Sequence, residues 1–308
     1  MLQRTGKELP DAGSFYDHSE GEPVWGQDLV YAFYTDHKTS YPLTFRQYGT
    51  DEDADQEDAE ATKYELAKEI ITELEEEIGV PAATYLFDLW FAHDSDLIGH
   101  VESHGKDWIG PRRSNRQVTF EGEQQRVNAL EEGIDTEERE IDDDIYNIWT
   151  KTLPVLQLDE RRLVIAETEI EDDEENPVKY FATNKIDASS AHIIRSYSKR
   201  WRVETFFGDS KEDLGLGGCE VRNSDGASID WHLQMLTDSL LRLGSPSSVS
   251  ERLVSKASLL RAQLEHGLKE TVYNVFAWVR DQPNRDLNGL MGEMDHLFLH
   301  SKGSEGCL

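Results

Sequence analysis

Four residues in the stretch YSKRWRVETFFGDSK, residues 197–211, have types and spacing that suit chemistry on a phosphate. Tyr197, Arg200, Glu204 and Lys211 follow one another at intervals of three, four and seven positions. On one helix they would fall within about 60° of one another, so we predict that they share a face. Aromatic rings can stack, cations can hold a phosphate and a carboxylate can bind a metal ion.

Two more rings, Trp201 and Phe207, lie on the same predicted face. A solvated face rarely carries three rings, whereas a face above an active-site cleft would use them. The alternative is that Arg200 and Glu204 form only an exposed pair worth roughly 0.3 kcal/mol.

A second candidate, Asp88, follows the short apolar run in PAATYLFDLWF, residues 81–91. Open α/β sheets place functional groups at the carboxyl ends of their strands, where the loops diverge. An aspartate at a strand end is also a common turn or cap residue. Its position alone therefore leaves both interpretations open.

A third group is basic. Arg112, Arg113 and Arg116 occur together in PRRSNR, residues 111–116. We interpret them as contacts to a DNA backbone. The alternative is that they pair with surface acids at little energetic gain.

The overall charge opposes a nucleic-acid partner at first sight. The 308 residues include 62 acids and 31 bases, which gives a net charge of -31. Molar internal salt shortens the Debye length to about 3 Å, so an acidic surface then hardly repels a phosphate at a distance. Because Arg (18) exceeds Lys (13) and acids are spread throughout, the composition resembles that of salt-loving archaea. The alternative is an ordinary acidic cytosolic protein.

No apolar run approaches the roughly 18 residues that a membrane span needs, and the opening residues have no signal-peptide core. We therefore expect a cytoplasmic protein without a membrane partner.

The elements that must position these residues are of mixed type. Alternating patterns predict a β-hairpin from strands at 24–35 and 41–49. Helical spacing predicts a helix over 61–79 that ends at Gly79 in a left-handed cap. A buried strand then leads to Asp88, a helix follows at 95–105 and a third strand begins at residue 107. This order predicts an α/β fold with some antiparallel pairing.

From about 117 to 185 the pattern changes to strands with acidic turns, and EDDEEN, residues 171–176, is the expected tip of a hairpin. The chain then returns to a helix over 189–215, followed by helices at 228–243 and 250–280.

The spacing Tyr197-x2-Arg200-x3-Glu204-x6-Lys211 resembles the Tyr-Arg-Glu-Lys signature of bacterial and archaeal insertion-sequence transposases, whose active site is Asp-Asp-Glu (DDE). YLFDLWF and GKDWIGPRRSNR also look like the second-aspartate region of haloarchaeal members, and the resemblance covers residues 4 to 240 approximately. It implies an RNase H-like core with a β-rich insertion before the glutamate. The regions are then 1–116 and 189–243 for the core, 117–188 for the insertion and 244–308 for a helical end.

Carried over by residue, the resemblance makes Asp88 the second catalytic aspartate and Glu204 the catalytic glutamate, both binding Mg²⁺ or Mn²⁺. Tyr197, Arg200 and Lys211 match signature positions near transposon-end DNA, and Trp201 is a further candidate for DNA binding. The implied activity is metal-dependent cleavage and transfer of DNA strands at transposon ends. The implied partners are the terminal inverted repeats and the target DNA.

The first aspartate of the family is expected just before the segment matched by QRTGKELP, residues 3–10. No aspartate precedes Asp11, which lies in a loop pattern, while Asp28 and Asp36 match hairpin positions. We therefore expect an amino-terminally truncated transposase that is inactive alone. The alternatives are a non-catalytic regulator that binds transposon ends, as a homodimer or mixed with full-length subunits, and a metal-dependent nuclease.

Overall fold

The structure is a computed structural model, and the chain divides into two compact units, Met1–Leu240 and Leu241–Leu308. The predicted positions of Asp11, the tip at 171–176 and the helical region at 244–308 lie outside the described residues. The described residues are 2–3, 12–17, 21–36, 40–49, 61–81, 84–155, 157–168, 178–218 and 224–243.

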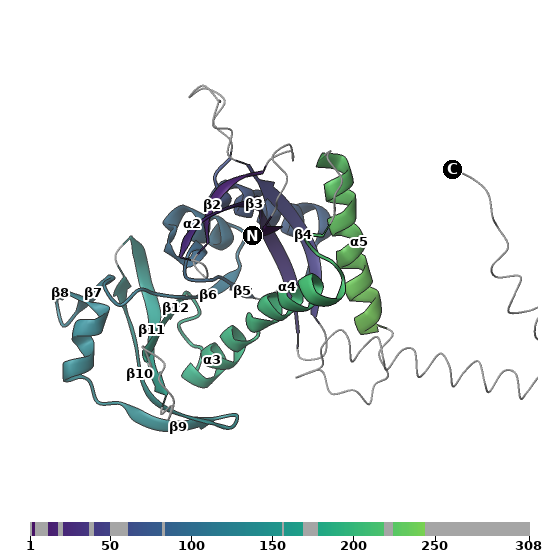
Figure 1. Cartoon of the computed structure of the whole chain (residues 1–308). Helices are drawn as coiled ribbons and strands as arrows, with labels where there is room; N and C mark the ends of the chain where they lie inside the picture. The colour runs from purple at the N-terminus through teal and green to yellow at the C-terminus, as the bar shows by residue number, and fades with distance from the viewer. Residues whose placement is uncertain are drawn as a thin grey trace, which may run out of the picture. The chain divides into compact units, whose positions relative to one another are not determined.

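A long strand, β3 (Glu22–Thr35), organises the first sheet. It pairs antiparallel with β1 (Leu2–Gln3), β2 (Gly13–Asp17) and β4 (Ser40–Tyr48). The predicted hairpin is therefore confirmed, with β3 and β4 side by side in Figure 1.

Helix α1 (Lys63–Thr72) packs on this sheet and starts in a capping box, because the Thr62 hydroxyl accepts from the Glu65 N–H while the Glu65 carboxylate accepts from the Thr62 N–H. The helix continues as a π-helical turn, Glu73–Ile78, and stops at Gly79 with φ 67°. The predicted left-handed stop is confirmed, since glycine adopts this conformation without a steric penalty.

The chain next forms β5 (Thr84–Leu86), α2 (Ser95–Ser103) and β6 (Asp107–Pro111). Asp94 caps α2 by accepting from the Leu97 N–H at 2.7 Å. Strands β5 and β6 pair in parallel, with Leu86 opposite Ile109. This β-α-β segment carries the sequence around Asp88.

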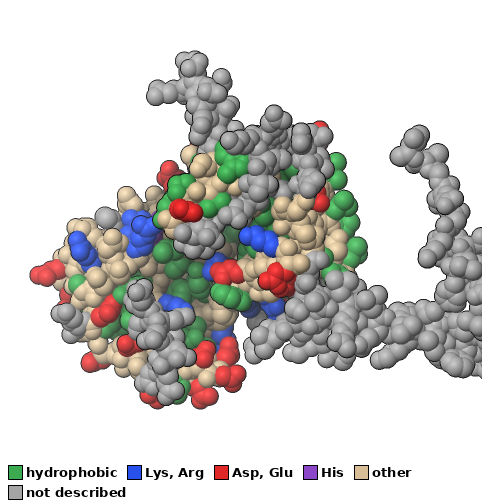
Figure 2. Space-filling view, in the orientation of Figure 1, with side chains coloured by type: hydrophobic (Ala, Val, Ile, Leu, Met, Phe, Trp, Pro, Cys, Tyr) green, Lys and Arg blue, Asp and Glu red, His purple; other side chains and the backbone are tan. Residues whose placement is uncertain are grey.

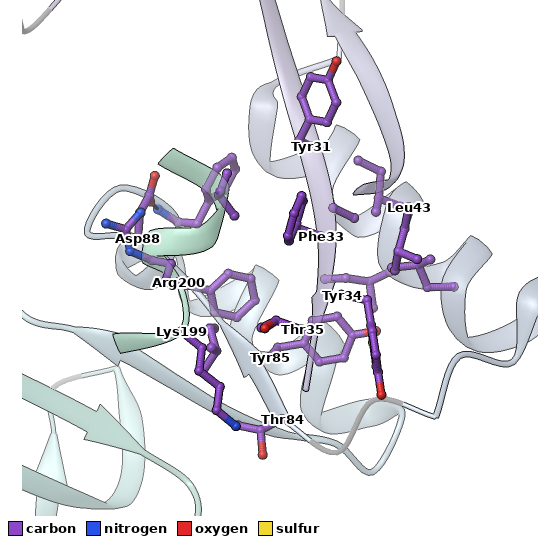
Figure 3. A pocket seen from close by; sticks show the side chains of 18 of the residues that line it. Tyr31, Phe33, Tyr34, Thr35, Leu43, Thr84, Tyr85, Asp88, Lys199 and Arg200 are labelled. Carbon is purple, nitrogen blue, oxygen red and sulfur yellow. Dashed lines mark hydrogen bonds between the residues drawn. The ribbon is translucent and has the colours of Figure 1, made fainter. Parts of the chain in front are cut away.

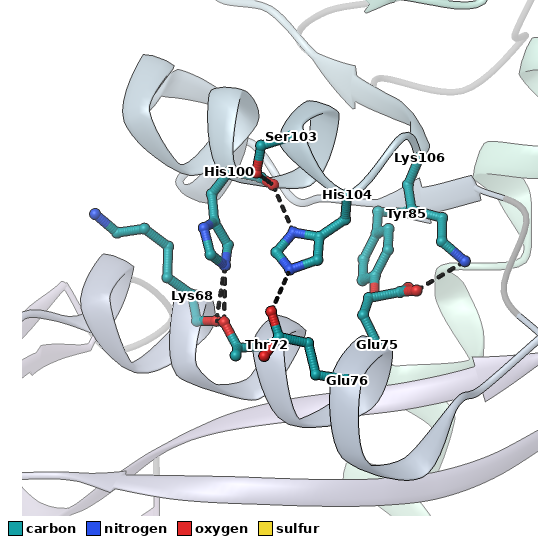
Figure 4. A network of polar contacts seen from close by, with 9 residues as sticks. All are labelled: Lys68, Thr72, Glu75, Glu76, Tyr85, His100, Ser103, His104 and Lys106. Atoms are coloured by element: carbon teal, nitrogen blue, oxygen red, sulfur yellow. Dashed lines mark hydrogen bonds and ion pairs between the residues drawn. The ribbon is translucent and has the colours of Figure 1, made fainter.

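Polar contacts join the π-helical turn to the β-α-β segment (Figure 4). Glu75 accepts from the Tyr85 hydroxyl at 2.7 Å and pairs with Lys106 at 2.8 Å. Glu76 lies 3.5 Å from Nε2 of His104. The turn therefore holds β5 and the end of α2 at fixed positions relative to α1.

Most of residues 117–183 are strands, and they extend the sheet begun by β5 and β6. Its order is β5-β6-β12-β11-β10-β7-β8, with β9 also paired to β10. Gly110 of β6 lies opposite Ala182 of β12, so residues far apart in the chain become neighbours. The additional strands are β7 (Gln117–Phe120), β8 (Glu123–Arg126), β9 (Glu137–Ile141), β10 (Asp144–Val155), β11 (Leu158–Thr168) and β12 (Val178–Thr183).

Three helices follow: α3 (Ser190–Ser198), α4 (Trp201–Asp213) and α5 (Ser224–Leu243). The prediction of one continuous helix over 189–215 is wrong, because the chain turns at Lys199 and Arg200. Across this turn the Arg200 N–H bonds to the Tyr197 carbonyl at 2.9 Å, and the Val203 N–H bonds to the Arg200 carbonyl at 3.0 Å. These i to i+3 bonds are tighter than α-helical ones, and no Gly or Pro marks the site.

The helices cover sheet faces whose side chains are buried. Trp108 of β6 packs with α1 and α2, and Ile193 of α3 packs with Phe181 of β12. Trp231 of α5 packs with Phe206 of α4 and with Phe45 of β4. The predicted α/β fold, a mixed sheet flanked by helices, is confirmed.

We predict that Gly110→Ala destabilises the fold by about 1–3 kcal/mol, because an added Cβ would lie 2.6 Å from Cβ of Ala92. The control is Gly99→Ala in α2, where a Cβ meets nothing within 4 Å and should stabilise the helix by about 0.5–1 kcal/mol. Urea unfolding of both variants measures the difference. Equal stabilities would contradict the close approach of Gly110 to Ala92.

Candidate active site

Asp88 lies two residues after β5, at the carboxyl end of a parallel strand, and is half-buried. Its Oδ1 accepts from the Phe91 N–H at 2.9 Å, and its carbonyl accepts from the Ala92 N–H at 3.0 Å. These bonds close the turn that leads from β5 into the short 3₁₀ helix Phe91–His93, a common role for an aspartate at a strand end. Within the described residues, no hydrogen bond joins Oδ2 of Asp88 to this turn.

The Arg200 guanidinium is the centre of a charged cluster at the junction of α3 and α4. It pairs with the carboxylate of Glu204 through Nη2 and lies over the Tyr197 ring at 5.6 Å. The Tyr197 ring in turn contacts Phe181 of β12 at 4.9 Å. The alternative of an i,i+4 pair is thus realised, but its arginine is only partly exposed and stacks on a half-buried ring.

The charges of Asp88 and Glu204 both shift the pKa of Arg200 and that of Tyr197, although 116 positions separate the two carboxylates in the sequence. Burial lowers the pKa of Arg200, but Tyr197, the bond and charge of Glu204, and the charge of Asp88 together raise it above its ordinary value. Burial raises the pKa of Tyr197, the Arg200 guanidinium opposes this, and both carboxylates add to the rise. The two carboxylates therefore share the neighbourhood of one guanidinium.

A cavity of about 540 Å³ opens beside this cluster. Apolar side chains of β3, α1 and β5 form most of its wall, and Asp88 and Arg200 lie at one end (Figure 3). Val203 and Phe207 of α4 also line it.

Sequence reasoning missed several polar residues at this cavity. Lys199 and Lys185 line it together with His192 and Ser196 of α3. Lys199 is adjacent to Arg200 in residues 197–211, so its position and charge could have identified it as a candidate site residue. Lys185 follows β12 and reaches the cavity only because β12 pairs with β6, which no local pattern reveals.

Trp201 and Lys211 both lie on α4 but outside the cavity lining. Trp201 is 65% exposed, and Lys211 is exposed near the end of the helix. Because the turn at Lys199 and Arg200 separates α3 from α4, Tyr197 does not share a helix with Glu204 and Lys211 as predicted. Both exposed side chains remain available to a partner.

The three arginines predicted to contact DNA have different surroundings. Arg113 is exposed, and Arg116 donates to the carbonyl of His93 at 2.9 Å. Arg112 is only 4% exposed, donates to the carbonyl of Ala92 and lies 5.2 Å from the Trp108 ring. Burial, followed by the charges of Arg116 and Arg161, lowers its pKa to about 9. Arg112 therefore supports the turn after Asp88 from inside the fold.

His93 ends this turn and faces the arginines. Burial lowers its pKa to about 4, and the positive charges of Arg116, Arg113 and Arg112 add to the effect. Both ring nitrogens are buried without a hydrogen-bond partner. A neutral imidazole beside three cations is consistent with this pKa.

Acidic and basic side chains are interspersed on the face shown in Figure 2, with hydrophobic side chains between them. None of the helices that the structure describes has the length and apolar character of a membrane span. Within the described ranges, no group of three or more His, Cys, Asp or Glu side chains is positioned to hold a metal ion.

We predict that His93 makes stability depend on pH between its ordinary pKa of 6.5 and about 4. In this window the unfolded chain binds a proton that the folded chain does not, so stability falls as the pH falls. The thermal midpoint of the native protein should therefore decline relative to that of His93→Gln as the pH is lowered from 6.5 to 4. Parallel curves for the two proteins would contradict the low pKa.

The comparisons with known proteins agree with this geometry. The sequence profile of one family, described as "Transposase DDE domain", matches residues 35–237, which is more than half of the chain. The match includes Asp88, the strands β4 to β12, and the cluster around Arg200 and Glu204. A search of curated proteins finds no match. The chain belongs to the transposase DDE domain family.

Proposed function

We propose that this chain is the RNase H-like part of an insertion-sequence transposase that cleaves and joins DNA strands at transposon ends. The observation that carries the proposal is the shared electrostatic neighbourhood of Asp88, Glu204 and Arg200. The proposed core comprises regions 1–116 and 189–243. Residues 117–188 are the β-rich insertion, and residues 244–308 are a carboxy-terminal helical region. Pairing of β6 with β12 supports the return of the chain to the core after the insertion.

The donor set fits a divalent metal. Carboxylate oxygens are the ligands that Mg²⁺ and Mn²⁺ prefer. Asp88 and Glu204 both already face a positive group, the Arg200 guanidinium. When bound, such an ion would polarise a phosphate oxygen and activate a water or 3'-hydroxyl nucleophile.

The remaining residues have roles that need no metal. The bond from the Phe91 N–H fixes one carboxylate oxygen of Asp88, so the side chain is oriented before any ligand arrives. Arg200, Lys199 and Lys185 can hold a phosphate of the DNA backbone at the cavity. Tyr197 keeps Arg200 in place through its ring. These side chains position the substrate strand.

The DNA outside the cavity is proposed to contact the exposed side chains. Trp201 can stack on an unpaired base, and Lys211 and Arg113 can each contact one backbone phosphate. We also propose a haloarchaeal setting, supported by the net charge of -31. In concentrated salt the acidic surface repels DNA weakly, so these few cations can decide where DNA binds.

A DDE site as implied by the resemblance has three carboxylates, whereas the proposal identifies two. We therefore expect the chain alone to bind DNA without cutting it. The alternative function is a regulator that occupies transposon ends, as a homodimer or with full-length subunits. It is favoured by the pairing of Glu204 with Arg200, which engages the carboxylate that catalysis requires.

We predict that Asp88→Asn and Glu204→Gln each weaken Mn²⁺ binding by about tenfold or more, since each removes a charged ligand. Asp88→Asn retains an oxygen acceptor for the Phe91 N–H, so the turn should persist. Arg200→Gln should strengthen Mn²⁺ binding, because it removes a competing positive charge. Isothermal titration calorimetry with MnCl₂ measures all three.

The matched control is Glu212→Gln, which neutralises an exposed carboxylate on the same helix. It should leave Mn²⁺ binding unchanged. An equal loss in the control and in the Asp88 and Glu204 variants would show that Mn²⁺ binds the acidic surface in general.

We predict that Arg113→Ala and Lys211→Ala each weaken binding to transposon-end DNA and each reduce the salt slope of binding by about 1. Arg139→Ala is the control, because this arginine is exposed but pairs with Glu137 on β9. Gel shifts over a series of KCl concentrations measure the slopes. Equal slopes for all three variants would exclude the proposed contacts.

The same DNA, incubated with the purified chain and Mg²⁺ or Mn²⁺ in high salt, should be neither nicked nor joined. Robust strand transfer would refute the proposed inactivity. Cleavage of DNA irrespective of sequence would instead indicate a nuclease.

A further inference from the structure

The turn that follows Asp88 exposes two large apolar side chains. Leu89 is 41% exposed and Trp90 is 48% exposed, and both lie between Asp88 and Phe91. The turn itself does not require them, because the Asp88 carboxylate closes it by accepting from the Phe91 N–H at 2.9 Å. Turn positions more often hold Gly, Pro, Asn, Asp or Ser. A single exposed apolar residue is ordinary, but an adjacent pair beside a candidate catalytic carboxylate points to a ligand of this site.

The Trp90 indole is held in place from helix α1. Its ring is parallel to that of Tyr64 within 7°, with the ring centroids 6.3 Å apart. The Tyr64 hydroxyl approaches the Trp90 carbonyl to 3.5 Å, and the Phe91 ring meets the Tyr64 ring edge-on at 6.0 Å. Phe91 in turn packs against the core that α1 and α2 share. The indole is therefore oriented before any ligand arrives.

Charges of both signs act on this aromatic pair. Burial raises the pKa of Tyr64, and the negative charges of Asp94 and Asp88 raise it further, whereas the positive charge of Arg113 lowers it. The pair therefore lies within electrostatic range of a carboxylate of the proposed active site and of an arginine that is proposed to contact a DNA phosphate. The carboxylates repel a phosphate from the rings, whereas a nucleobase is flat and uncharged and can stack on them.

Apolar side chains in such a position can enter a DNA duplex. Proteins that bend DNA insert them between neighbouring base pairs, which unstacks the step and kinks the helix by about 20–90°. Successive phosphates of one strand are about 3.4 Å apart along the helix axis, so two adjacent side chains of one turn would act on one base step. Asp88 directly precedes Leu89, so this step would adjoin the phosphate that Asp88 reaches.

We propose that Leu89 and Trp90 are positioning residues that form a wedge in DNA, with Trp90 stacked on a base and Leu89 filling the opened step beside the phosphate that faces Asp88. The inference rests on the proposed function, because it describes how the same site holds its DNA. Unstacking a base step costs free energy, and a mismatched step has already lost part of its stacking. The wedge therefore makes the site prefer DNA that is mismatched at this step over fully paired DNA.

The test compares the affinities of the full chain for two kinds of duplex of transposon-end sequence, one fully paired and one with a single mismatch. A set of duplexes with the mismatch at successive positions locates the contacted step. The unaltered chain should bind the duplex mismatched at that step at least about tenfold more tightly than the paired duplex, because less unstacking is needed. Fluorescence anisotropy measures both affinities.

Trp90→Ala should bring the two affinities within about threefold of each other, because the stacking surface is lost. Trp90→Phe retains a ring and should keep most of the preference. The matched control is Ile145→Ala on β10, which removes an apolar side chain that is 46% exposed, and it should leave the preference unchanged. Circular dichroism checks that all three variants fold. A purely structural role for Trp90 would lower both affinities equally and leave their ratio as it was.

A second measurement is energy transfer between dyes at the two ends of the paired duplex. The unaltered chain should bring the dyes closer together, because the wedge kinks the DNA. The double variant Leu89→Ala, Trp90→Ala should leave the dyes at the separation of free DNA, even at concentrations that saturate the duplex.

Three results would overturn the wedge alone. One is the same preference for mismatched DNA in Trp90→Ala as in the unaltered chain, and another is an equal loss of affinity for both duplexes in that variant. The third is binding of the paired duplex by the unaltered chain without a preference for any mismatch position, which would leave the proposed function standing. Failure of the unaltered chain to bind either DNA would overturn the proposed function, and the wedge with it.

Discussion

The Arg200 guanidinium makes it possible for two carboxylates to share one neighbourhood in a chain with a net charge of -31. Without a cation, the negative charges of Asp88 and Glu204, which both act on Arg200 and Tyr197, would repel each other. Arg200 pairs with Glu204 and feels Asp88, and Tyr197 supports it through its ring. Under the proposed function, Asp88 and Glu204 would hold a divalent ion, which would supply positive charge here in addition to that of Arg200.

The sheet brings these groups together. Strand β6 pairs in parallel with β5 on one side and antiparallel with β12 on the other. Pairing of β5 with β6 positions the turn that contains Asp88. Pairing of β12 with β6 positions α3 and α4, which follow β12 and contain Arg200 and Glu204. Gly110 lets that turn approach β6 closely, and Arg112 supports it from the interior.

The local features could be predicted from sequence, because each depends on neighbouring residues. These include the β3–β4 hairpin, the stop at Gly79 and the strand end near Asp88. The break between α3 and α4 could not, since it arises from i to i+3 bonds at Lys199 and Arg200 without Gly or Pro. Arg112 and Arg113 are adjacent and identical in type, yet only the fold buries one and exposes the other. Lys185 reached the cavity through long-range strand pairing.

The π-helical turn at Glu73–Ile78 limits how the length of this segment can change during evolution. A π-helical turn accommodates one residue more than an α-helical turn, so loss of a single residue would restore the regular helix. The residues after the deletion would then rotate by about 100° around the helix axis. Glu75 and Glu76 would no longer both face Lys106 and His104, so this wide turn and its partners on the neighbouring segment must be inherited together.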